Sequence, residues 1–179
     1  MAADDHDFIE ATLDLPIRYI DRSRAYYLSL GFGNPYRWAH FDDVPFTPLA
    51  KPLSATRVGL VSTAAPLNPG AGDQGPWAAY NASAKFTEVY TLPIEPEPDV
   101  RISHLGYDRK HTSAEDHNSY FPLARLKEAA AAGRIGALNE RFIGVPTLRS
   151  QRITMEQHAT AVLDTCRTDG IEAAVIVPT

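Results

Sequence analysis

The sequence contains a single cysteine, Cys166, among its 179 residues. One cysteine cannot form a disulfide within the chain, so the disulfide framework typical of small secreted domains is excluded. No run approaches the roughly 18 consecutive apolar residues that a membrane helix needs. The N-terminal segment, Met-Ala-Ala-Asp-Asp-His-Asp, is acidic and lacks the apolar stretch of a secretory signal. We therefore expect a cytoplasmic protein without a membrane partner.

An excess of positive charge is also lacking. The 17 Lys and Arg residues are outnumbered by 22 Asp and Glu residues, which gives a formal net charge of -5. Nucleic acids and anionic membranes attract basic surfaces, so neither is expected as a partner. With 44% hydrophobic residues, the chain is long enough for one domain with a full core and too short for two comfortable ones.

In the first third of the chain, apolar residues recur with helical spacing only near the start. Pro16 suits the first turn of a helix, and a rough apolar stripe follows it as far as Gly31. From residue 33 to residue 52, prolines and aromatics follow one another without periodicity. We interpret residues 1–56 as a helix and an irregular Pro-rich arm, which packs across the domain or onto a partner.

Strand-like and helix-like patterns alternate through residues 57–179, which we expect to form one structural unit. Five short apolar runs are typical of strands: residues 57–62, 86–92, 100–102, 141–145 and 172–177. Two amphipathic patterns predict helices, residues 122–133 and 154–170. The alternation predicts a single α/β domain with a mainly parallel sheet and helices on both faces.

The second of these helices has the clearest signals. Thr154 and Gln157 match a capping box, and Gly170 would end the helix. The residues spaced to line its apolar side are Met155, Ala159, Val162, Leu163 and Cys166. On this pattern Cys166 is a small core residue.

Residues 70–75 match the dinucleotide-binding pattern G-x-G-x-x-G. That pattern binds a pyrophosphate where its glycines form the tight turn between a strand and a helix. Here the match begins several residues beyond the strand, lies between Pro69 and Pro76, and opens no amphipathic helix. We interpret it as a loop and expect no nucleotide cofactor.

Side chains with proton-transfer and metal-binding chemistry concentrate in residues 99–118. Three of the six histidines fall between His104 and Asn118, together with Tyr107, Asp108, Glu115 and Asp116. His104 follows the apolar run at residues 100–102, so we expect it at the carboxyl end of a strand. Open α/β sheets bind their ligands at such strand ends.

Two kinds of site are compatible with this segment. In one, His104 donates a proton and Asp108 orients it, without a metal. In the other, a divalent metal such as zinc, iron or manganese is bound by ligands drawn from His104, Asp108, His111, Asp116 and His117. Their spacing matches no strong metal-binding signature. The candidate substrate-binding residues are Ser62, Thr63, Tyr107, Asp116, Asn118, Arg149 and Ser150, although Ser150 suits a helix cap at least as well.

Four short motifs occur in order between residue 45 and the C-terminus. They are Val58-Gly-Leu-Val-Ser-Thr-Ala64, Ser103-His-Leu-Gly-Tyr-Asp108, Asp116-His-Asn118 with Phe121-Pro-Leu-Ala-Arg-Leu126, and Ala174-Val-Ile-Val-Pro-Thr179. Together they resemble the selenoprotein B family of glycine, sarcosine, betaine and D-proline reductases. The resemblance implies reductive cleavage of a carbon–nitrogen bond in a small amino acid or its N-methylated relative. It also implies a complex with a second protein subunit.

The resemblance has one departure, at its end. In the family, the last strand runs into a Pro-Thr or Pro-Gly pair, and the reactive selenocysteine or cysteine follows directly. This sequence ends at Thr179, and Cys166 on a helix face is in the wrong place to replace that nucleophile. Either the codon after Thr179 is a UGA read as selenocysteine in the native host, or the chain is a short paralogue whose site a partner completes.

The leading function is therefore a subunit of a heteromeric reductase-like enzyme that acts on a small amine or amino-acid-like substrate. The first alternative is a metal-dependent hydrolase or lyase subunit that uses residues 104–117. The second is a non-catalytic structural partner of a related catalytic chain. The sequence does not specify the substrate, the partner or its stoichiometry, and it leaves a divalent metal open as the cofactor.

Overall fold

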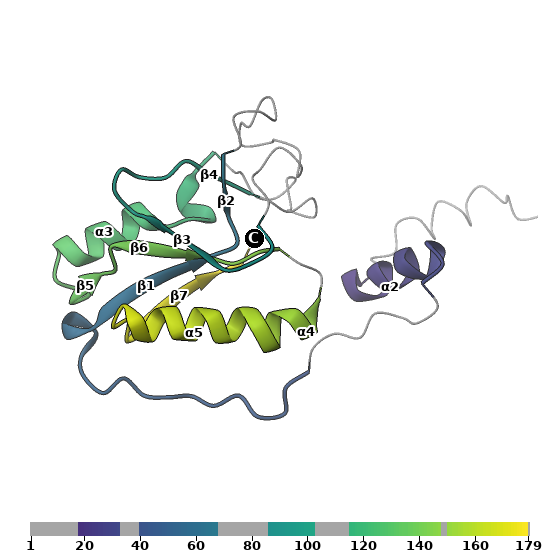
Figure 1. Cartoon of the computed structure of the whole chain (residues 1–179), viewed down its shortest axis with the longest axis horizontal. Helices are drawn as coiled ribbons and strands as arrows, with labels where there is room; N and C mark the ends of the chain where they lie inside the picture. The colour runs from purple at the N-terminus through teal and green to yellow at the C-terminus, as the bar shows by residue number, and fades with distance from the viewer. Residues whose placement is uncertain (1–17, 33–39, 68–85, 103–114, 148–149, 179) are drawn as a thin grey trace, which may run out of the picture. The chain divides into compact units, whose positions relative to one another are not determined.

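Strand β1 (Arg57–Ser62) is the centre of the sheet in the computed structural model, which describes residues 18–32, 40–67, 86–102, 115–147 and 150–178 (Figure 1). Every residue of β1 after Arg57 is buried, as expected for a strand covered on both faces. The predicted strand at residues 57–62 is therefore confirmed.

β1 has parallel neighbours along both of its edges. β7 (Ala173–Val177) pairs with one edge, and β5 (Ala137–Leu138) and β6 (Arg141–Gly144) pair with successive parts of the other. β3 (Tyr90–Pro93) adds an antiparallel strand next to β6. The sheet is mixed but mostly parallel, and this confirms the predicted α/β class.

The strand predicted before His104 does not join this sheet. β4 (Val100–Arg101) pairs antiparallel with β2 (Ala65–Pro66), a short strand that follows β1. Prolines at positions 96 and 98 lack the N–H that a ladder needs, which limits the strand to a short stretch after them. The strand predicted at residues 100–102 is therefore present as β4, but it is not part of the mainly parallel sheet, and Ser103 and His104 lie outside the described residues.

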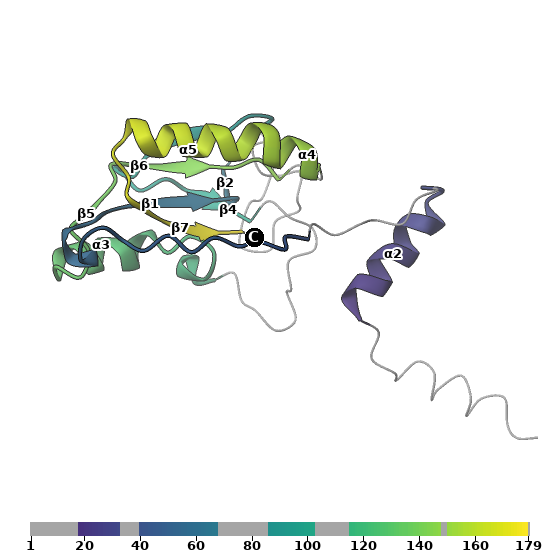
Figure 2. The ribbon, with the colours of Figure 1, turned by 90° about the horizontal axis from the view of Figure 1, so that it is seen from below.

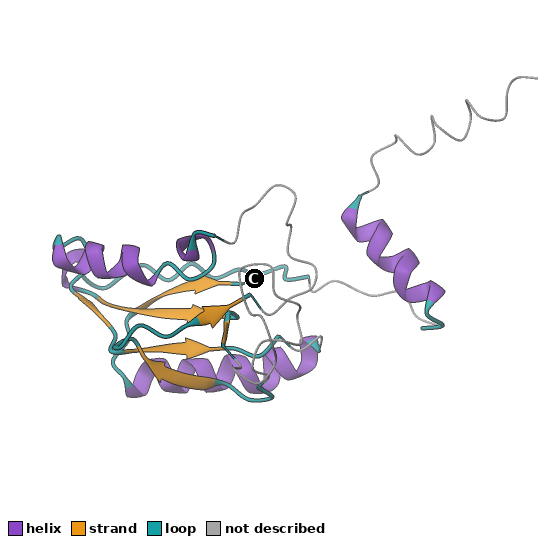
Figure 3. Ribbon diagram, turned by 90° about the horizontal axis from the view of Figure 1, so that it is seen from above, coloured by secondary structure: helices purple, strands orange, loops and turns teal. Residues whose placement is uncertain are grey.

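Helices cover both faces of the sheet (Figure 2, Figure 3). On one face lies α3 (Leu123–Ala131), which confirms the helix predicted there, and the 3-10 turn η4 (His117–Ser119) precedes it. On the other face α4 (Gln151–Ile153), the π-helical segment η5 (Thr154–His158) and α5 (Ala159–Thr168) form one continuous helix.

This second helix begins earlier than predicted. Its N-cap is Ser150, whose Oγ accepts a hydrogen bond from the Ile153 N–H at 3.3 Å, so Thr154 lies inside the helix and not at its start. The predicted apolar side is also partly wrong, because Met155 is 53% exposed and Leu163 is 48% exposed. A π-helical turn shifts the register of the residues around it, and the buried residue in η5 is His158.

The core is concentrated on the α3 side of the sheet. Its central cluster joins Leu60 of β1 and Phe142 of β6 to Leu123 of α3, and its other members are Ala64, Val100, Tyr120 and Phe121. The rings of Phe121 and Phe142 meet edge to face, with centroids 4.9 Å apart. On the other face, α5 itself contributes no buried residue.

The chain divides into two compact units, Met1–Pro45 and Phe46–Thr179. In the first, α2 (Tyr19–Ser29) confirms the helix predicted before Gly31, and none of its residues is buried. In the second, the side chains of residues 46–55 are exposed, while the Leu53 carbonyl accepts a hydrogen bond from the Gly136 N–H at 3.1 Å and Lys51 pairs with Glu172 at 2.8 Å. Among the residues that the structure describes, no helix is both long enough and apolar enough to cross a membrane.

Candidate functional site

The parallel strands of the sheet end at two opposite edges. We call the end at Ser62, Gly144 and Val177 the carboxyl edge of the sheet, and the end at Arg57, Arg141 and Ala173 the amino edge. Ligands of open α/β sheets bind at the carboxyl edge. The candidate residues of the sequence analysis that fall within the described chain lie at or near it.

Ser62 ends β1 and is only 1% exposed. Its Oγ accepts a hydrogen bond from the Ala64 N–H at 3.0 Å and donates one to the Tyr120 carbonyl at 3.4 Å. Thr63 is half-buried, and its N–H donates to the Val177 carbonyl at 3.3 Å. The Ser62 hydroxyl therefore holds the turn after β1, while the backbone of Thr63 extends the pairing of β1 with β7.

Tyr90 of β3, which lies on the far side of β6 from β1, also contacts this turn. Its hydroxyl donates to the Ala64 carbonyl at 3.1 Å, and its ring stacks on Phe86 with centroids 3.8 Å apart. Burial raises the pKa of Tyr90 to about 12. The ring also covers Gly144, where an added Cβ would lie 2.0 Å from the Tyr90 Cζ. Only glycine fits beneath this ring.

The third motif forms a local hydrogen-bonded turn. Asp116 is the N-cap of η4, and its Oδ1 accepts hydrogen bonds from the Asn118 N–H at 2.9 Å and Nδ2 at 2.8 Å. These bonds, the backbone one first, lower the pKa of Asp116. The Oδ1 of Asn118 is buried and has no hydrogen-bond partner in the described part of the chain. His117 is exposed, with its ring centroid 5.5 Å from that of Tyr120.

Several predicted site residues lie outside the described residues: His104, Tyr107, Asp108, His111 and Arg149. The remaining candidates lie at the end of β1 (Ser62 and Thr63), at the start of η4 (Asp116, His117 and Asn118) and at the N-cap of α4 (Ser150). Across the described ranges, no three His, Cys, Asp or Glu side chains are grouped so that they could hold a metal ion.

His158 is a residue that the sequence analysis did not select. It is 3% exposed, its Nε2 lies 3.3 Å from the Thr87 carbonyl, and its buried Nδ1 has no partner among the described residues. Buried polar atoms without a partner are rare, and π-helical turns are frequent at functional sites. No signal in the sequence distinguishes His158, because its burial depends on the phase of the π-helical turn.

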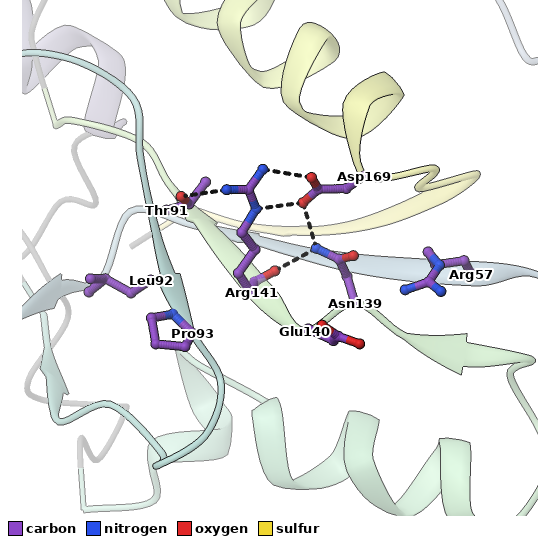
Figure 4. Close-up of a pocket in the computed structure, with 8 residues that line it drawn as sticks. All are labelled: Arg57, Thr91, Leu92, Pro93, Asn139, Glu140, Arg141 and Asp169. Atoms are coloured by element: carbon purple, nitrogen blue, oxygen red, sulfur yellow. Dashed lines mark hydrogen bonds and ion pairs between the residues drawn. The ribbon is translucent and has the colours of Figure 1, made fainter.

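A pocket of about 580 Å³ lies at the opposite end, the amino edge (Figure 4). Its lining residues are Arg57, Thr91, Leu92, Pro93, Asn139, Glu140, Arg141 and Asp169. Sequence analysis selected none of them. It did supply a signal, however, since Arg57 and Arg141 are the first residues of two predicted strands, and parallel strands begin at the same edge.

An ion pair forms one wall of this pocket. Arg141 binds Asp169 through two hydrogen bonds, Nε to Oδ2 at 2.8 Å and Nη2 to Oδ1 at 2.6 Å. Asn139 Nδ2 donates to the same carboxylate at 2.9 Å and to the Arg141 carbonyl at 2.8 Å. The bond from Arg141 is the main cause that lowers the pKa of Asp169.

Comparison with known protein families, with curated protein sequences and with solved structures finds no match for this chain. Of the four sequence motifs, residues 58–64 and residues 174–179 lie on β1 and β7 and beyond their ends, and residues 116–126 form η4 and the start of α3.

Proposed function

We propose that this chain is a cytoplasmic subunit of a heteromeric reductase-like enzyme of the selenoprotein B type. Its reaction would be the reductive cleavage of a carbon–nitrogen bond in a small amine or amino-acid-like substrate. The observation that carries the proposal is the parallel pairing of β1 with β7, from Val58 beside Ala173 to Ser62 beside Val177. This pairing brings the first and last family-like motifs side by side, and both strands end at the carboxyl edge, where such folds bind ligands.

The register also supports a location for the reactive residue. In the family that the motifs resemble, the selenocysteine or cysteine directly follows the pair after the last strand. Here Val177 accepts a hydrogen bond from the Thr63 N–H, so the chain after Val177 leaves the sheet at the carboxyl edge, where we propose that the reactive residue would follow. A nucleophile at that position would reach a substrate bound at the carboxyl edge.

The nucleophile would be a selenocysteine or cysteine beyond Thr179, or a group from the second subunit. Cys166 does not suit this role, because burial, followed by the nearby charge of Asp169, raises the pKa of its thiol. A thiol with a raised pKa is mostly protonated at neutral pH, and the thiolate is the reactive form.

Proton transfer and substrate binding would come from the loops at the carboxyl edge. His104 would donate a proton to the nitrogen as the carbon–nitrogen bond breaks, and Asp108 would orient the imidazole. The Oδ1 of Asn118 has no partner among the described residues, and it is an acceptor suited to an ammonium or N–H group of the substrate. Asp116, which holds the Asn118 amide group, would position that acceptor, while Tyr107 and Arg149 would bind other polar groups of the substrate.

The test begins with the protein purified under gentle conditions from its native host. We expect a second subunit to co-purify, and the intact mass to show whether the chain extends beyond the 19.7 kDa of its 179 residues. The complex, supplied with a dithiol as the reductant, should act on at least one of four substrates: it should release ammonia or an amine from glycine, sarcosine or betaine, or open the ring of D-proline to give 5-aminopentanoate. A complex that assembles and does neither would overturn the proposal.

Two variants test the role of the histidine in the assembled complex. His104→Ala should slow release by about 100-fold or more, the usual contribution of a general acid. The matched control is His40→Ala, a change at an exposed histidine in the first compact unit. Unchanged release by His104→Ala would favour the structural-partner alternative. Loss of a stoichiometrically bound metal together with the activity would favour the metal-dependent alternative.

A further inference from the structure

The amino-edge pocket contains two opposite charges that do not neutralise each other. Arg57 and Glu140 both line it, and Figure 4 shows no interaction between them. Within the described residues, the Arg57 guanidinium makes no hydrogen bond and no ion pair, and neither does the Glu140 carboxylate. The backbone of Arg57 is engaged instead: its N–H donates to Glu172 Oε2 at 3.0 Å, and its carbonyl accepts from the Glu172 N–H at 3.0 Å.

The charges around them are already paired. Arg141 is bound to Asp169 in the pocket wall, and Lys51 is bound to Glu172 at 2.8 Å. Arg57 is close enough to lower the pKa of Asp169 and of Glu172, although it is not the main cause for either. Counting the pairs leaves one cation and one anion without a partner on the pocket lining. A small molecule that carries both charges is the chemical complement of such a lining.

We propose that the amino-edge pocket binds a small amino acid in its zwitterionic form. The guanidinium of Arg57 would bind its carboxylate, a geometry that arginine favours through two parallel hydrogen bonds, and Glu140 would bind its ammonium group. Leu92 and Pro93 supply an apolar wall for the carbon chain. A simple anion would be repelled by the negative charge of Glu140, and a simple cation would be repelled by the positive charge of Arg57. The two side chains together therefore select a zwitterion.

This site is separate from the proposed reductase site, because it lies at the opposite end of the parallel strands, and it does not depend on that proposal. The pocket is preformed, since the Arg141–Asp169–Asn139 network fixes its wall without a ligand. An amino acid bound at the amino edge would not be a substrate of the proposed reductase site at the carboxyl edge. It would be a regulatory or stabilising ligand.

The experiment is a calorimetric titration of the full chain with glycine, β-alanine and 4-aminobutanoate, and with propionate and ethylamine as singly charged controls. At least one amino acid should bind saturably and about tenfold more tightly than either control. Arg57→Gln and Glu140→Gln should each weaken binding by about tenfold, the cost of losing a charged hydrogen bond. The matched controls Arg134→Gln and Glu88→Gln change the same charges outside the pocket and should leave binding unchanged.

A second measurement keeps the result independent of variant folding. Amide shifts of the unmodified protein, recorded during the same titration, should move at Thr91, Asn139 and Arg141. Shifts confined to Ser62 and Thr63 would place the ligand at the carboxyl edge and overturn the second site. The absence of saturable binding, equal binding of propionate, or binding that neither pocket variant weakens would overturn it as well.

Discussion

The two ends of the same parallel strands are held together by different kinds of interaction. At the amino edge, charged side chains bind one another, as in the Arg141–Asp169 pair. At the carboxyl edge, uncharged groups form the contacts, as in the hydrogen bonds between the Ser62 and Tyr90 hydroxyls and backbone groups. The described sheet residues at the carboxyl edge therefore provide a frame without charge, and under the proposed function the reactive groups would come from the loops that follow it.

The largest effect is expected where packing at the carboxyl edge is tightest. In Gly144→Ala the new Cβ would lie 2.0 Å from the Tyr90 Cζ, and that ring is held by Phe86 and Phe142. We expect the free energy of unfolding to fall by about 3 kcal/mol or more, the upper range for overpacking. Urea unfolding monitored by circular dichroism measures it.

A double variant shows whether the ring causes this loss. In a Tyr90→Ala background the new methyl group meets no ring, so Gly144→Ala should then cost roughly 1 kcal/mol or less. If the two changes were additive, the contact between Gly144 and Tyr90 would not explain the effect, and the contrast between a packed carboxyl edge and a charged amino edge would fail.

The next effect tests the charged edge. Asp169→Asn removes the carboxylate that holds Arg141 and Asn139, and the Asp169 side chain is only 12% exposed. We expect a loss of about 2 kcal/mol, as for a charged hydrogen bond that is largely shielded from water. The matched control is Asp164→Asn in α5, whose exposed pair with Arg167 is 3.8 Å long and should contribute less than roughly 0.5 kcal/mol.

The same pair predicts how stability depends on acid. Arg141 lowers the pKa of Asp169 in the folded protein. The ion pair therefore stabilises the fold above the pKa of an unfolded aspartate, about 4, and this stabilisation is lost as the pH falls through the lower pKa of folded Asp169. The wild type and Asp169→Asn should therefore converge in unfolding free energy below about pH 4. A constant difference from pH 7 to pH 2 would mean that the carboxylate charge is not the source.

Much of the frame could be predicted from the sequence because its signals are local. Residues 57–62, 141–144 and 173–177 are short apolar runs, and Gly133 and Gly170 stop their helices with φ of 65° and 66°. The partner of β4 was not predictable in this way. Pairing is a contact between distant segments, and two residues of strand carry no pattern that names their partner.

The pocket at the amino edge also depends on contacts between distant segments, which the sequence does not predict. The positions of Arg57 and Arg141 at strand starts, and of Asp169 at the end of the helix before β7, could be predicted. The contact between Arg141 and Asp169 could not, because it joins segments 28 residues apart. The start of that helix was misassigned because Ser150 and Thr154 are both suitable caps, and only the folded chain selects Ser150. Similarly, the burial of His158 follows from the π-helical turn that the periodicity did not reveal.

The smallest effect returns to the carboxyl edge. Tyr90→Phe keeps the ring over Gly144 and removes only the hydrogen bond to the Ala64 carbonyl, so it should cost about 1 kcal/mol at neutral pH. The pKa of Tyr90 is about 12 in the folded protein and about 10 in an unfolded chain. Between these values only the unfolded chain releases the proton, so the wild type should lose stability as the pH rises, and the deficit of Tyr90→Phe should shrink.

Urea unfolding of the wild type and of Tyr90→Phe between about pH 7 and pH 11 measures how the difference in unfolding free energy changes around the pKa of an unfolded tyrosine. A deficit that stays constant would mean that the Tyr90 hydroxyl is not buried against Ala64. If the deficit shrinks instead, the two edges would then differ in how their stability responds to pH. The stability difference caused by Tyr90→Phe would shrink as the pH rises, and the difference caused by Asp169→Asn would shrink as the pH falls. The amino edge then loses its charged contact on acidification, and the carboxyl edge loses its uncharged one on alkalinisation, because one depends on an ionised group and the other on a neutral one.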